Sequence, residues 1–191
     1  MWSFTNYRSA ACFDELWGLL NYKYDDCFGY FTEHLYKKVY VLKKEEHFLF
    51  QPGEWLGAGQ VSFSMSPDVL HFRTKWEVTP GDSSSFSCTQ TVEIVGGDRL
   101  INMFEITPQS SDRFTVVLEN DELGTFEGTG LVDEKMVAWE FRDKGVFEGF
   151  EVYKRVEDDE YTMHAEYVSS DQTRTMIRGR IWRRAHYRDK E

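Results

Sequence analysis

The sequence predicts a mainly β protein, a single antiparallel up-and-down β-barrel of about ten strands with a short N-terminal helix. Three observations support this prediction. Segments of about eight to eleven residues rich in Val, Ile, Phe, Tyr and Thr follow one another from Trp55 onward. The links between these segments are short and carry turn residues. Aromatic residues make up 16% of the chain, a high share that favours strands.

The first 50 residues form a helix-containing extension in this interpretation. Residues 9–21 place apolar side chains at three-to-four spacing after Ser9, which can cap a helix, so we expect one short amphipathic helix there. Residues 36–43 are compatible with a helix or a strand, and their β-branched and aromatic side chains favour a strand.

Ten strands follow, and their apolar side chains alternate, as in Val61, Phe63 and Met65. Because the links are too short for crossover helices, neighbouring strands should be antiparallel. Closure into a barrel removes the exposed edges of such a sheet, whereas the alternative, a two-sheet sandwich, would need longer connections. The predicted strands cover residues 55–65, 68–78, 84–95, 99–107, 112–119, 122–131, 134–142, 146–155, 159–168 and 174–184.

We expect one domain over residues 1–191, with the barrel at 51–185 and a charged tail at 186–191. No segment approaches the roughly 20 apolar residues of a membrane span, and the N-terminus lacks a signal-peptide pattern. The three cysteines, Cys12, Cys27 and Cys88, fit neither a disulfide framework nor a paired metal motif, which favours reduced thiols and a cytoplasmic location.

The charge of the chain argues against a nucleic-acid partner. Asp and Glu number 33 against 22 for Lys and Arg, and the resulting net charge of −11 repels phosphate backbones.

A short motif stands at the start of the predicted barrel. Gly53-Glu54-Trp55 resembles the Gly-X-Trp motif of the calycin-like superfamily, which includes lipocalins, fatty-acid-binding proteins and nitrobindin-like barrels. The resemblance implies that Trp55 closes one end of the barrel under a basic side chain from the last strand, for which Arg183 is the candidate. Ten strands fit the fatty-acid-binding or nitrobindin-like branch better than the eight-stranded lipocalins. The first 50 residues match neither branch.

The same resemblance implies a small apolar or amphipathic ligand inside the barrel, held by a few polar anchors. In fatty-acid-binding relatives an inward Arg near a Tyr holds a carboxylate, so Arg178 or Arg180, together with Tyr161, is the candidate anchor. The alternative is that these arginines face solvent or pack on Trp55. We add two aromatic residues, Trp76 and Trp139, to the candidate ligand-binding set.

Haem is a candidate cofactor through His164, which lies roughly where nitrobindin-like relatives carry the histidine that ligates haem iron. The other histidines stand at no metal-ligand spacing, and no nucleophile or phosphate-binding motif is present. Most of the acidic residues within strands should face water on the outside of the barrel. They are Glu77, Glu93, Glu105, Glu127, Glu140, Glu148 and Glu151.

A small-molecule binding or carrier protein is the favoured function. One alternative is an enzyme on the same scaffold, such as an isomerase, hydrolase or chromophore lyase, which would need titratable side chains converging inside the barrel. The other is a protein-interaction module with a filled barrel, whose acidic surface would dock a basic protein partner.

Overall fold

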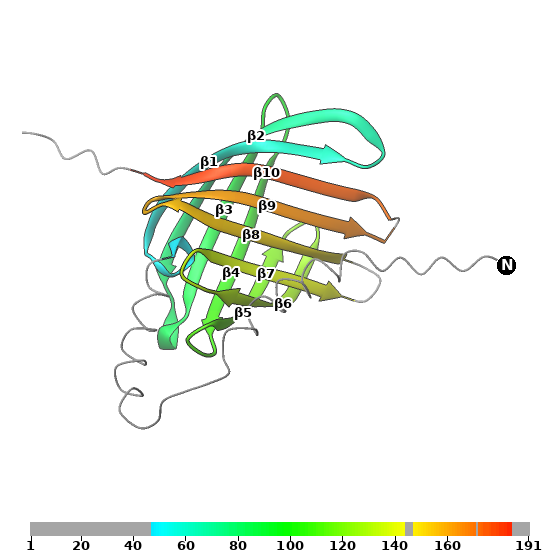
Figure 1. Ribbon diagram of the computed structural model, residues 1–191. Helices are drawn as coiled ribbons and strands as arrows, with labels where there is room; N and C mark the ends of the chain where they lie inside the picture. Colours follow the sequence, from blue (N-terminus) through cyan, green and yellow to red (C-terminus); the bar gives the residue numbers. More distant parts are fainter. Residues whose placement is uncertain (1–46, 144–146, 171, 185–191) are drawn as a thin grey trace, which may run out of the picture. The chain divides into compact units, whose positions relative to one another are not determined.

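The computed structural model describes residues 47–143, 147–170 and 172–184, and within them ten antiparallel strands close into a barrel (Figure 1). Each strand pairs with its neighbours in the sequence, and pairing of the first strand with the last completes the barrel. The strands are β1 (Gly53–Phe63), β2 (Ser66–Pro80), β3 (Phe86–Ile94), β4 (Arg99–Pro108), β5 (Arg113–Asn120), β6 (Gly124–Val132), β7 (Met136–Asp143), β8 (Phe147–Glu157), β9 (Glu160–Ser169) and β10 (Arg174–Arg183).

The predicted fold class is therefore confirmed, and each predicted strand overlaps an observed one. The first turn differs from the prediction, because it lies at Ser64 and Met65 and not at residues 66–68. Met65 consequently projects from the turn with 82% of its surface exposed, although the alternating pattern predicted an inward side chain.

Helix in the described part of the chain is limited to two 3-10 turns, η1 (Phe48–Phe50) and η2 (Asp82–Ser84). Neither is long and apolar enough to cross a membrane. The helix expected at residues 9–21, the strand expected near 36–43 and the tail at 186–191 lie outside the described residues.

One end of the barrel is closed by the residues of the Gly-X-Trp motif. Trp55 is fully buried, and the guanidinium carbon of Arg183 lies 5.6 Å from the centroid of its indole ring. Gly53 has a φ of 145°, a backbone conformation that favours glycine, and a Cβ there would lie 3.7 Å from Nη2 of Arg183. Arg183 also donates to Oε1 of Gln51 at 2.9 Å, which holds its guanidinium in place over the indole.

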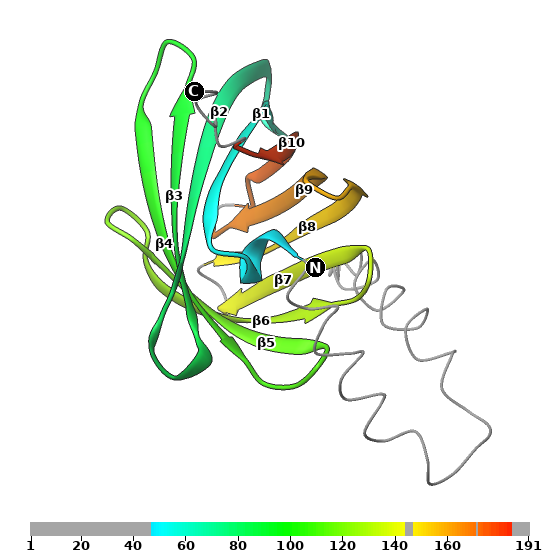
Figure 2. The ribbon, with the colours of Figure 1, turned by 90° about the vertical axis from the view of Figure 1, so that its left-hand side faces the viewer.

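The turn η1 fills the interior at this same end, where β1 begins (Figures 1 and 2). Phe48 and Leu49 are fully buried and Phe50 is 3% exposed. The ring of Phe48 lies 4.8 Å from that of Tyr153 and 5.4 Å from that of Tyr161, centroid to centroid, and its backbone N–H donates to the Tyr161 hydroxyl at 3.3 Å. Residues 48–50, expected in the N-terminal extension, therefore form part of the barrel core.

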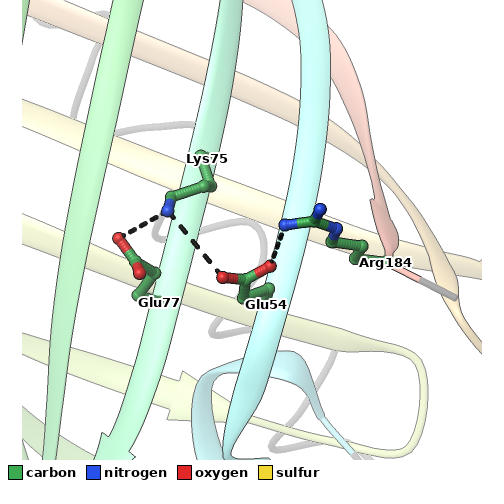
Figure 3. Close-up of polar contacts among 4 residues, drawn as sticks. All are labelled: Glu54, Lys75, Glu77 and Arg184. Carbon is green, nitrogen blue, oxygen red and sulfur yellow. Dashed lines mark hydrogen bonds and ion pairs between the residues drawn. The ribbon is translucent and has the colours of Figure 1, made fainter. Parts of the chain in front are cut away.

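On the outer face, a chain of charged groups links β1 to its two neighbours, β2 and the end of β10 (Figure 3). Glu54 of β1 accepts from Arg184, just after β10, at 2.5 Å and lies 3.8 Å from Nζ of Lys75 on β2. Lys75 also pairs with Glu77 at 2.9 Å. These side chains are partly exposed, so their net contribution to stability is small, and the aromatic interior supplies most of the stabilisation.

Candidate functional site

The end of the barrel opposite Trp55 is less completely filled. Inward-facing apolar side chains there are only half-buried, among them Phe63 at the end of β1, Ile94 at the end of β3 and Ile177 near the start of β10. At the closed end, by contrast, Trp55 and the two rings that contact it, those of Phe48 and Tyr161, are fully buried. The interior is therefore nearest to solvent at this second end, which we call the open end.

A carboxylate is buried between the two ends. Glu151 of β8 is 5% exposed and faces the interior. The Tyr153 hydroxyl donates to its Oε2 at 2.8 Å, and the Tyr167 hydroxyl donates to its Oε1 at 2.5 Å. Each carboxylate oxygen thus accepts one phenolic hydrogen bond and retains a lone pair for a further donor.

The strand register brings these three side chains together. Glu151 and Tyr153 are two residues apart on β8 and so share one face, while Tyr167 comes from β9, where it pairs with Gly149. A Cβ at Gly149 would lie 2.2 Å from Cδ1 of Tyr167, so only glycine leaves room for the Tyr167 ring in this position. Glu151 itself pairs with Trp139 of β7 and with Ala165 of β9, a small residue.

Burial raises the pKa of Glu151 above its ordinary value. Hydrogen bonds from Tyr167, Tyr153 and the nearby Trp139 indole act in the opposite direction but do not outweigh burial. Burial and the charge of Glu151 also raise the pKa values of Tyr153 and Tyr167, which therefore remain hydrogen-bond donors at neutral pH. Among the described residues no Lys or Arg forms an ion pair with Glu151.

A row of amide side chains lines the interior on β3, β4 and β5. Gln90, Asn102 and Asn120 are successive partners in the register of these strands. Asn120 Nδ2 donates to Asn102 Oδ1 at 2.7 Å, and Asn102 Nδ2 donates to Gln90 Oε1 at 2.8 Å. Gln90 and Asn120 are 6% and 5% exposed, so most of this row is buried.

Two buried donors beside this row lack an acceptor within the described part of the chain. They are the indole N–H of Trp76, which pairs with Gln90 across β2 and β3, and the hydroxyl of Thr74 on β2. The indole N–H groups of Trp55 and Trp139 likewise make no hydrogen bond of ordinary geometry there, although that of Trp139 lies near Glu151. Such groups are rare in folded proteins, and ligands or water satisfy them where they occur.

Three of the predicted ligand-binding residues do face the interior. Trp76 and Trp139 are fully buried, with ring centroids 6.4 Å apart in a T-shaped arrangement. Tyr161 is also fully buried, but it lies at the closed end, where its hydroxyl accepts from the backbone of Phe48.

The other three predicted residues lie on the outer surface. Arg178 and Arg180 are exposed, and Nη1 of Arg180 forms an ion pair with Glu160 at 3.0 Å. The expectation that one of them points inward is not met, because Ile177, Gly179 and Ile181 occupy the inward positions of β10. Both arginines face solvent instead, as the alternative interpretation stated.

His164 also faces outward on β9, opposite Arg178 on β10. Its ring lies 5.7 Å from that of Phe150, and burial together with the positive charge of Arg178 lowers its pKa. A haem inside the barrel would therefore be out of reach of this histidine. The described residues hold no cluster of three or more His, Cys, Asp or Glu side chains suited to a metal ion.

Cys88 is an inward core residue on β3 and not a reactive thiol. It is fully buried, and burial raises the pKa of its thiol to about 12. The thiolate is the nucleophilic form, and it is scarcely populated at neutral pH.

A hollow of about 420 Å³ lies over the outer face of β5, β6 and β7. Its charged lining residues are Glu127, Glu140 and Arg142, and Arg142 pairs with Glu140 at 2.9 Å. None of the buried polar atoms that lack a partner in the described residues belongs to its lining. The interior around Glu151 is therefore the stronger candidate site.

Glu151 is an exception to the expectation that most acidic residues within strands face water. Strand β8 carries apolar side chains on both faces, since Phe150 and Val152 alternate with Gly149 and Tyr153. Alternation alone therefore could not show which face is inside. The only signal in the sequence is the spacing of Glu151 and Tyr153, which places an acid and a phenol on one face.

Replacing Glu151 should change how stability depends on pH. Because folding raises the pKa of Glu151, its contribution to stability is fully present below the unfolded value of 4.5 and is lost as pH rises through the folded pKa. We expect the free energy of unfolding of Glu151→Gln, minus that of the parent protein, to increase as pH rises from about 4.5. Urea denaturation at several pH values measures this difference.

Glu148→Gln is the matched control, because Glu148 lies on the same strand with its side chain exposed. Its denaturation midpoints should run nearly parallel to those of the parent protein across the same pH range. Parallel curves for Glu151→Gln would contradict a raised pKa at Glu151.

Comparison with solved structures finds proteins that share the fold of this chain. The S-type phycobiliprotein lyase from Guillardia theta matches with a TM-score of 0.59 at 7% identity, over 79% of this chain and 98% of that chain. Rv2717c from M. tuberculosis matches with a TM-score of 0.57 at 15% identity, over 70% of this chain and 92% of that chain. No protein-family model and no curated protein matches the sequence. At these identities the likeness concerns the fold.

Proposed function

We propose that this chain binds one small, largely apolar molecule inside its barrel, with the carboxylate of Glu151 contacting the polar group of that molecule. The observation that supports the proposal is a buried carboxylate that has two tyrosine donors and no cationic partner among the described residues. Burying such a group without full compensation costs several kcal/mol. A barrel filled only for stability would gain from an apolar side chain at this position.

The barrel itself supports the same proposal. Barrels of about this size can enclose one small ligand, and aromatic side chains with a few placed polar groups are typical of ligand sites. Trp139 and Tyr153 are stacked with ring centroids 5.2 Å apart next to Glu151, and they provide a flat apolar surface. The half-buried residues at the open end mark the side from which a ligand would enter.

A fluorescence titration with N-phenyl-1-naphthylamine, a neutral apolar probe with one N–H donor, tests the proposal on the full chain. We expect enhanced, blue-shifted emission that saturates at one probe per chain. In Glu151→Leu the N–H of the bound probe is left without an acceptor, which costs about 1 to 3 kcal/mol, and affinity should fall by about tenfold.

Glu148→Leu is the control, because it removes an exposed carboxylate from the outer face of the same strand. It should bind the probe as the parent protein does. Absence of saturable emission, or an unchanged affinity in Glu151→Leu, would reject the proposed site. Native mass spectrometry of protein purified from its own cells would then identify the natural ligand.

A further inference from the structure

The direction of the hydrogen bonds in the amide row is determined by the backbone. Oδ1 of Asn120 accepts from the backbone N–H groups of Glu122 and Leu123 at 2.9 and 3.0 Å. A backbone N–H can only donate, so the accepting atom must be the amide oxygen of Asn120. Nδ2 of Asn120 then donates to the carbonyl of Ile101 at 3.2 Å and to Oδ1 of Asn102 at 2.7 Å.

This direction passes along the row to its last member. Because Asn102 presents its oxygen to Asn120, its Nδ2 donates to Oε1 of Gln90, and the Nε2 donors of Gln90 are left at the end of the row. Within the described part of the chain no acceptor is bonded to them. The buried Trp76 indole N–H and Thr74 hydroxyl, which also lack a partner among the described residues, lie on the same β2–β3 wall as these amide donors.

The opposite wall has the complementary character. In the closed order of strands, β8 lies five places from β3 in either direction, which is halfway round the barrel. Its Glu151 offers the lone pairs of a carboxylate, while Tyr153 and Tyr167 already use their hydroxyl hydrogens on it. Among the described residues, donors without acceptors on one side of the barrel thus stand opposite a carboxylate without a cationic partner on the other. The two sides meet at Trp76 and Tyr153, whose ring centroids lie 6.0 Å apart.

We infer that the ligand is an apolar molecule with two different polar ends, a carbonyl bound by Gln90 and Trp76 and an N–H group bound by Glu151. This inference rests on the proposed function and specifies the class of molecule. A carboxylate head, such as that of a fatty acid, would find no Lys or Arg paired with Glu151 among the described residues to bind it. The arginines that do face inward, Arg155 and Arg183, lie at the closed end, against Tyr161 and Trp55.

Three matched fluorescent naphthalenes test the inference on the full chain. The first, 6-acetyl-2-(methylamino)naphthalene, carries a carbonyl at one end and an N–H at the other. The second, 6-acetyl-2-(dimethylamino)naphthalene, lacks the N–H, and the third, 2-(methylamino)naphthalene, lacks the carbonyl. We expect the unaltered protein to bind the first probe about tenfold more tightly than either of the others.

Two variants assign each end of the probe to its residue. Gln90→Met should weaken the first probe about tenfold and leave the third unchanged, because the third has no carbonyl to lose. Glu151→Leu should weaken the first probe to a similar extent and leave the second unchanged.

The outcomes separate this inference from the proposed function. Equal affinity of the unaltered protein for all three probes would overturn the inference while leaving an interior binding site in place. Equal weakening of all three probes by both variants would also overturn it, because the residues would then act only on the structure. If none of the probes binds, the proposed function fails as well.

Discussion

Trp55→Ala is expected to lower the free energy of unfolding by about 3 to 5 kcal/mol. The indole is fully buried, its ring centroid lies 5.8 Å from those of Phe48 and Tyr161, and Arg183 covers it. Its removal would leave a cavity at the closed end and remove the ring over which the guanidinium of Arg183 lies. Chemical denaturation followed by far-ultraviolet circular dichroism measures the loss.

Trp182→Ala is the matched control, because it removes the same side chain from the outer face of the strand that ends in Arg183. Trp182 is 40% exposed and pairs with Leu56, next to Trp55 on β1. We expect a loss of less than about 1 kcal/mol. Similar losses for the two variants would show that Trp55 does not close the barrel.

Phe48→Ala should have an effect of the same size, about 3 to 5 kcal/mol. Its ring makes edge or tilted contacts with four other aromatic rings, those of Trp55, Trp76, Tyr153 and Tyr161. Loss of this ring should also weaken the near-ultraviolet circular dichroism of the tryptophans, since their packing becomes less ordered. Denaturation and the near-ultraviolet spectrum measure both effects.

Phe48→Leu keeps an apolar side chain of moderate volume in the same place and should lose only about 1 to 2 kcal/mol. A negligible change in Phe48→Ala would mean that η1 does not contribute to the core. Because Phe48 packs on Tyr153, and Tyr153 donates to Glu151, Phe48→Ala should also weaken binding of the fluorescent probe.

The strand meander could be predicted because it depends on features that lie close together in the sequence, and its closure because a barrel leaves no exposed edge strands. Turn residues at regular intervals marked the ends of the strands, and the short links required antiparallel neighbours. The pairing of Trp55 with Arg183 followed from the resemblance to calycin-like barrels, since it joins the first strand to the last. Residues 47–50 gave no comparable signal, because a three-residue turn has no periodicity to detect.

The candidate site could be predicted only in part. Trp76 and Trp139 were expected to face the ligand and do face the interior. Arg178 and Arg180 were expected to anchor it, yet they occupy the outward positions of a strand whose apolar side chains, Ile177 and Ile181, point inward. Most acidic residues within strands were expected to face water, and the sequence did not single out Glu151 as the buried carboxylate.

The sequence by itself therefore determined the number and order of the strands, because turn chemistry and alternation are local properties, and it favoured closure, because a barrel leaves no exposed edges. Only the tertiary structure decided which face of β8 is inside and how η1 packs into the closed end. It also decided the direction of hydrogen bonds from Asn120 to Gln90. The reason is that a shift of one residue in strand register exchanges the two faces, and the inward face is selected by packing against strands distant in sequence, as between Tyr153 of β8 and Trp76 of β2.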